Sequence, residues 1–238
     1  MKRVKQDLKQ QNKRRIYSMA QAKALVIIAD RYHEPGYIKE GLGPVFAAEN
    51  VDAEFTEDVK ALSAKNLRGR QLLVIHRDGM IWPNGYDQPY VMWMTREQEQ
   101  AVADFVRNGG GFMPLHNSIA IYPKDGPYRE VCAGHFIFHP AVETFTVHII
   151  NKKHPVTQGA ENYELTDEQH FVECDVDRVE LLSRSHSETH GESHDGWAYE
   201  YGKGRVCFLA NGHILEAIKH PMYQILLKNA VQWCLRRT

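Results

Sequence analysis

The chain lacks several features that would assign it quickly to a class of protein. No apolar run approaches the ~20 residues of a membrane-spanning helix, and no apolar segment follows the basic N-terminus as it does in a signal peptide. Its four cysteines (Cys132, Cys174, Cys207 and Cys234) show no CxxC spacing, which argues against a zinc ribbon or a disulfide framework. We therefore expect a cytoplasmic protein with no membrane partner.

Common nucleotide-binding and nucleophile motifs are also missing. There is no GxGxxG or GxxxxGK[ST] phosphate loop, so no nucleotide cofactor is expected. The glycine-rich turn over residues 109–118 ends in His116, Asn117 and Ser118 and contains no cysteine, which argues against a cysteine-dependent amidotransferase or protease. No GxSxG motif surrounds Ser118, although a serine nucleophile beside a histidine stays open.

Charge is nearly balanced overall but uneven along the chain. The 238 residues carry a formal net charge of -1, so nothing draws the whole protein to nucleic acid. Seven of the 29 basic residues lie within residues 1–15, beside a single acidic residue. We predict that residues 1–22 form a flexible basic arm. A solvated tail is favoured over a nucleic-acid or membrane contact, so no nucleic-acid partner is expected.

The remaining residues, 23–238, are predicted to form a single α/β domain, since 43% hydrophobic and 25% charged residues is ordinary globular composition. Apolar segments rich in branched residues predict buried strands, and they alternate with helical patterns. This alternation favours a mostly parallel sheet covered by helices on both faces, with some antiparallel pairing within residues 140–185. The polar segment 184–196 is predicted to be a loop. The predicted buried strands are 23–30, 72–75, 111–115 and 204–210.

A histidine follows each of these four strands: His33, His76, His116 and His213. Carboxyl ends of parallel strands share one edge of a sheet, where ligands bind, so we expect the imidazoles to converge there. A lone strand-end histidine is more often structural, but four together favour a functional site.

Such a cluster can carry out two kinds of chemistry. Imidazole acts as a general acid or base near neutral pH, or as a neutral ligand of zinc and similar metals. Nearby carboxylates, among them Asp78, Asp167 and Glu168, can ligate, orient a histidine or act as a base. The residues alone leave a metal site and a metal-free acid-base site open. His139, four residues after His135, is a candidate pocket wall.

Residues 77–94 form a long predicted loop with two prolines, two glycines and four large aromatic side chains. Loops of this length in a compact domain are often binding loops. Trp82 and Tyr86 offer flat faces that suit a sugar ring. The alternative, that these rings only pack the loop onto the domain, is equally weighted.

Over residues 23–238 the motifs together resemble the ThuA-like (trehalose-utilisation) family. The matching pieces are His33-Glu34, residues 109–118, Gly134-His135-Phe136 leading to His139-Pro140, residues 154–159, Asp167-Glu168, Trp197, residues 201–206 and Asn211-Gly212-His213.

This resemblance implies a flavodoxin-like three-layer sandwich similar to the class I glutamine amidotransferase domain, without the amidotransferase cysteine. It also implies a role in carbohydrate catabolism, on disaccharides or their keto forms, and it singles out His33, His116 and His213. Asn117 and Gln169-His170 depart from the family pattern, and the aromatic loop is particular to this chain.

We therefore predict a sugar-processing hydrolase or lyase acting on a disaccharide or keto-glycoside. His116 and His33 would be acid-base groups or ligands of a divalent metal such as zinc, with His213 as the third member and Glu168 as helper. The alternative is a non-catalytic sugar- or metal-binding protein, and either form can be a homo-oligomer. The predicted substrate-binding residues are His76, Asp78, Trp82, Tyr86, Asn117, Ser118 and His139.

Overall fold

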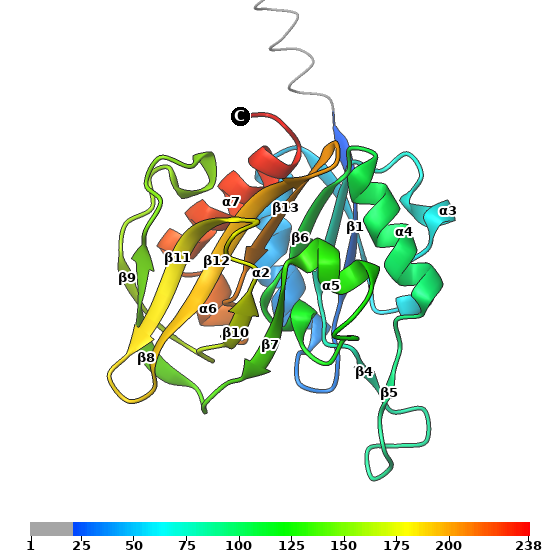
Figure 1. The fold of residues 1–238 in the computed structure, drawn as a ribbon, viewed down its shortest axis with the longest axis horizontal. Helices are drawn as coiled ribbons and strands as arrows, with labels where there is room; N and C mark the ends of the chain where they lie inside the picture. The colour runs from blue at the N-terminus through cyan, green and yellow to red at the C-terminus, as the bar shows by residue number, and fades with distance from the viewer. Residues whose placement is uncertain (1–20) are drawn as a thin grey trace, which may run out of the picture.

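Figure 1 shows a computed structural model of the chain, which describes residues 21–238. The predicted basic arm, residues 1–22, lies outside this range except for its last two residues. Within the described residues, no helix combines the length and the apolar character needed to cross a membrane. The single-domain boundary at residue 23 stays a prediction.

A nine-stranded mixed sheet forms the centre of the molecule, in the order β2-β1-β3-β6-β13-β12-β11-β8-β9. The first five strands are parallel and the remaining neighbours pair antiparallel. The predicted α/β class is confirmed, but the parallel arrangement holds for only one half of the sheet. In sheet order, the strands are β2 (Val51–Thr56), β1 (Ala22–Ile28), β3 (Leu72–His76), β6 (Gly111–Pro114), β13 (Gly204–Leu209), β12 (Gly191–Tyr201), β11 (Glu180–Ser187), β8 (Glu143–Ile149) and β9 (Tyr163–Asp167).

Helices cover both faces of the sheet, and a hydrophobic core lies under each cover. One face packs against α2 (Pro35–Ala48), α6 (Leu215–Ile218) and α7 (Pro221–Cys234). The other packs against η1 (Val59–Ala61), α3 (Ala64–Leu67), α4 (Arg96–Arg107), α5 (Pro127–Cys132) and the ribbon of β7 (Gly134–Phe138) and β10 (Phe171–Cys174). Side chains of β1 alternate between the two cores, as expected for a strand buried on both faces.

Local sequence explains where the elements begin and how closely they pack. Thr95 and Gln98 form a capping box that starts α4. Gly41 lies where α2 crosses α6, and a Cβ there would come within 2.4 Å of Ile218 Cγ2. Gly109 adopts φ 116° just after α4, a conformation that favours glycine.

The predicted loop over residues 184–196 is wrong. Strands β11 and β12 continue through this segment and join in a tight hairpin at residues 188–190. The inward-facing side chains are polar but hydrogen-bonded: Ser183 Oγ donates to Asp195 Oδ2 at 2.9 Å, and Gln169 Nε2 donates to Ser185 Oγ at 3.2 Å. Because these buried groups are serines and an aspartate, the hydrophobic alternation that marks a strand is absent.

Asp195 makes the stability of the protein depend on pH. Complete burial raises the pKa of its carboxyl from 3.8 to about 6, so its stabilising contribution is full below pH ~4 and is lost as pH rises through 6. The variant Asp195→Asn escapes this loss. Between pH 4.5 and pH 7.5, urea unfolding should show its free energy of unfolding improving on the wild type by about 2 kcal/mol. A difference that stays constant with pH would contradict the role of Asp195.

Candidate active site

The four strand-end histidines lie at one edge of the sheet, at the bottom of Figure 1. Strands β1, β3, β6 and β13 are parallel neighbours, so their carboxyl ends meet there. His33 Nε2 lies 3.1 Å from His116 Nε2 and 3.0 Å from His213 Nδ1. Side chains up to 180 positions apart in the chain thus come into direct contact.

Glu168 completes this cluster from the other half of the sheet, because it lies between β9 and β10. Its Oε2 lies 3.2 Å from His213 Nδ1 and 3.8 Å from His116 Nε2. One ligand atom from each of His33, His116, Glu168 and His213 falls within 4.8 Å of all the others. These four residues together can hold a metal ion.

The turn after β6 sets the orientation of His116. His116 opens η2 (His116–Ile119) and adopts φ 49°, a left-handed conformation that is uncommon outside glycine. The side chain is fully buried, and its Nδ1 lies 2.8 Å from the carbonyl oxygen of Ala210. Nδ1 must therefore carry the hydrogen and donate it, which leaves a lone pair on Nε2 facing the cluster.

Asp30 does the same for His33. His33 Nδ1 donates to Asp30 Oδ1 at 2.7 Å, and Asn117 Nδ2 donates to Asp30 Oδ2 at 2.6 Å. Burial by itself would raise the pKa of Asp30, but the bonds from His33 and from the backbone N–H groups of Asp78 and Tyr32 outweigh it and lower the pKa to about 2. Asp30 is thus ionised, and His33 presents its Nε2 lone pair to the cluster.

Two imidazole lone pairs therefore face each other at 3.1 Å with no hydrogen between them. Burial lowers the pKa of His116 well below 6.5, and it also lowers the pKa of His213. Burial would raise the pKa of Glu168, but neighbouring histidines, above all His170, lower it. Neutral imidazoles beside an ionised carboxylate attract a cation. Tetrahedral zinc places its ligand atoms about 3.3 Å apart, within the range of separations found here.

The family of the protein follows from comparison with known sequences. Residues 22–234 match the model of the ThuA family, described as trehalose utilisation. The chain belongs to the ThuA family. No protein of curated function matches it.

Solved structures share the fold of this ThuA-family chain at low sequence identity. A protein described as ThuA-like from Parabacteroides merdae is 18% identical, with a TM-score of 0.73 over 91% of each chain. A cytoplasmic protein from Salmonella typhimurium LT2 is 14% identical, with a TM-score of 0.65 over 89% of this chain and 99% of that one. A β-galactosidase from Bacillus circulans is 12% identical, with a TM-score of 0.58 over 90% of this chain and 31% of that one.

A cavity of about 550 Å³ opens beside the cluster of the ThuA-family chain. Of the predicted substrate-binding residues, Asp78, Asn117 and His139 line it together with His33, Glu168 and His213. Tyr32, Met80, Ala120, Ile121 and Phe136 add apolar surface, and His170 completes the wall. The cavity thus combines groups that bind hydroxyls with an apolar wall.

Two predicted substrate-binding residues lie away from this cavity wall. His76 is buried beneath the cluster, and its Nε2 donates to the carbonyl oxygen of Gly212 at 3.0 Å. Burial lowers the pKa of His76 to about 3, so it is a neutral packing partner of the rings of His33 and His116. Ser118 is fully buried and is not among the residues that line the cavity.

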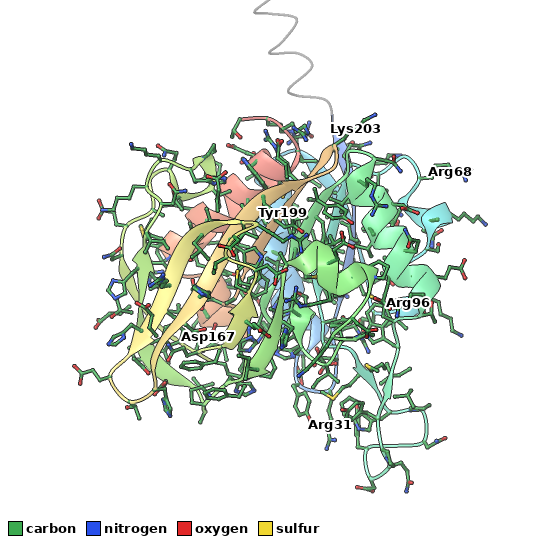
Figure 2. The ribbon with its side chains drawn as sticks, in the orientation of Figure 1. Arg31, Arg68, Arg96, Asp167, Tyr199 and Lys203 are labelled. Carbon is green, nitrogen blue, oxygen red and sulfur yellow. The ribbon has the colours of Figure 1, made fainter. Side chains whose placement is uncertain are left out.

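Trp82 and Tyr86 line a neighbouring cavity of about 610 Å³. Their rings contact each other at 5.5 Å and surround the guanidinium of Arg31, which lies 4.5 Å from the centre of the Tyr86 ring. Tyr32 links the two cavities, because it lines the first and its ring lies 6.2 Å from Trp82. Figure 2 shows Arg31 at the base of the hairpin that carries the aromatic rings.

Three residues of the site were not assigned to it from the sequence. Asp30 ends a predicted strand, the same signal that marks the histidines. His170 stacks on His116 at 4.1 Å and lies 3.6 Å from Glu168 Oε2. Asp167 accepts hydrogen bonds from the backbone N–H groups of Gly212 at 2.7 Å and His213 at 3.0 Å, so it fixes the loop that carries His213. Only the fold reveals these last two contacts.

The bond to Ala210 predicts the tautomer and the titration of His116. Nitrogen-15 NMR of the imidazoles should show His116 in the Nδ1–H form at pH 7, because a carbonyl oxygen can only accept. The resonance should keep its neutral position down to pH 5, since burial lowers the pKa. The variant His116→Asn assigns the signal. A titration midpoint near 6.5, or the Nε2–H form, would contradict this geometry.

Proposed function

We propose that the protein is a carbohydrate-active hydrolase or lyase that uses a divalent metal such as zinc. The facing lone pairs of His33 and His116, with His213 and Glu168 alongside, are the observation that carries this proposal. Three histidines and a carboxylate form a donor set that zinc accepts. His33, His116, His213 and Glu168 would hold the ion. Once bound, it would polarise a substrate oxygen or lower the pKa of a water molecule.

The cavity supports an uncharged carbohydrate as substrate. Its described lining contains Asp78, Asn117 and His139 but no lysine or arginine, so a phosphate or carboxylate group would find no cationic partner there. The family description, trehalose utilisation, points to a disaccharide or its keto form. The aromatic cavity of Trp82 and Tyr86 would hold a second sugar ring. A non-catalytic sugar- or metal-binding protein is the alternative that the experiment below separates.

Asp78 is the proposed proton donor in this cavity. Burial and the charge of Asp30 raise the pKa of Asp78 to about 7, so a large share of the molecules carry a proton on this carboxyl at neutral pH. Such a group can protonate the oxygen of a departing sugar. His116 and His33 stay neutral and position the reacting ring.

Two broader assignments belong to the same proposal. The helices on both faces of the parallel half support a flavodoxin-like sandwich of the class I glutamine amidotransferase type. The Salmonella proteins of the same fold are described as cytoplasmic, which supports a cytoplasmic location for this chain.

The variant His116→Ala tests the metal and the reaction together. It removes one of four ligand groups, so zinc bound per chain, measured by elemental analysis, should fall from about one to well below one. Turnover of trehalose or its keto form should fall at least ~1000-fold at an unchanged unfolding temperature. His186→Ala, on the exposed face of β11, is the control and should change neither. Full activity of His116→Ala would contradict the proposal, and stoichiometric sugar binding without product would favour the binding protein.

Asp78 predicts the pH dependence of the reaction. A proton donor works only in its protonated form, so kcat/KM should fall about tenfold for each pH unit above pH ~7. Asp78→Asn cannot supply a proton, and its residual kcat/KM should not show this fall. A wild-type profile that stays level from pH 6 to pH 9, or an unchanged fall in Asp78→Asn, would remove Asp78 from the mechanism.

A further inference from the structure

A two-stranded hairpin projects from the body next to the cavity. We call residues 80–92 the arm; it contains β4 (Met80–Ile81) and β5 (Val91–Met92). Figure 1 shows it standing clear of the sheet and helices at the bottom of the molecule. Its base is fixed, since the buried Trp93 donates from Nε1 to the carbonyl oxygen of Asp78 at 2.8 Å. The arm carries a single charged residue, Asp87.

Exposed apolar side chains gather on this arm and around the mouth of the cavity. Isolated exposed hydrophobics need no explanation, but a contiguous group indicates an interaction surface. Nine of the eleven large hydrophobic residues that are exposed lie at this edge, each 36–60% exposed. On the arm they are Tyr86, Tyr90, Val91 and Met92, and around the mouth they are Tyr32, Ile121, Ile137, Phe138 and Val142.

The size of this surface matches an interface between proteins. At these exposed fractions, the nine side chains present on the order of 900 Å² to solvent, and a standard interface buries ~800 Å² of each partner. The composition also fits, since interface cores are rich in tyrosine, phenylalanine and methionine and poor in charge. A two-stranded hairpin is marginally stable in water by itself, so the arm gains stability by packing on a partner.

We propose that the partner is a second copy of this chain, in a two-fold dimer in which each arm lies across the mouth of the other copy's cavity. The arm and the mouth are two apolar surfaces of similar chemistry, side by side on one chain. A two-fold axis brings the arm of each copy onto the mouth of the other and covers both surfaces at once. The arm of one copy then closes the cavity of its partner, which excludes water from it.

Sedimentation of the full-length chain tests the dimer. The wild type should sediment at twice its monomer mass of 27.4 kDa at micromolar concentration. Met92→Lys places a charge in the apolar contact and should weaken the dimer at least ~100-fold without lowering the unfolding temperature, because Met92 is exposed. Ile150→Lys is the matched control, since Ile150 is an exposed apolar residue beyond the far end of β8, and it should leave the dimer intact.

A variant of the mouth tests the geometry. Ile137→Lys should dissociate the dimer as Met92→Lys does, because each arm is proposed to lie on the partner's mouth. Dissociation by Met92→Lys alone would mean that the arms pair with each other, which would overturn the arrangement. A wild type that stays monomeric to ~100 µM would overturn the dimer, and binding of that monomer to phosphatidylcholine vesicles would assign the surface to a membrane instead.

Discussion

The hydrogen bond between His33 Nδ1 and the Asp30 carboxylate is the constraint on which the rest of the site depends. It joins a charged acceptor to an imidazole at 2.7 Å and decides which nitrogen of His33 remains free. Without it, His33 could turn its hydrogen towards His116, and the two rings would form an ordinary hydrogen bond. With it, the cluster keeps an excess of lone pairs, which only a cation can satisfy. Asp30 in turn is held ionised by donors from Asn117, Tyr32 and Asp78.

The parallel half of the fold could be predicted because its strands are buried on both faces. Continuous apolar runs such as residues 72–75 mark such strands, and each run ends where a polar group faces the crevice. That rule brings His33, His116 and His213 together without any structure. It fails for His76, which follows a strand equally well but turns beneath the cluster to bond Gly212. Strand ends identify the edge of the sheet, but not which side chains reach the cavity.

The antiparallel half could not be predicted in the same way. Ser183, Ser185 and Asp195 face inward there and satisfy one another by hydrogen bonds, so no hydrophobic pattern marks β11 and the start of β12. Glu168 and His170 belong to the segment that leaves this half and crosses to the ribbon of β7 and β10. Their position beside His116 depends on long-range packing. The sequence could place a carboxylate near the site, but not show that one oxygen lies within 4 Å of His116, His170 and His213.

The position of β13 in the sheet has a consequence for how the protein is made. This strand, at residues 204–209, lies between β6 and β12, so it joins the parallel half to the antiparallel half. During synthesis both halves are complete in sequence before β13 leaves the ribosome, and each presents an open strand edge until then. His213 arrives with the same segment. Closure of the sheet and assembly of the histidine cluster are therefore a single late event, and a chain that stops before residue 204 can have neither.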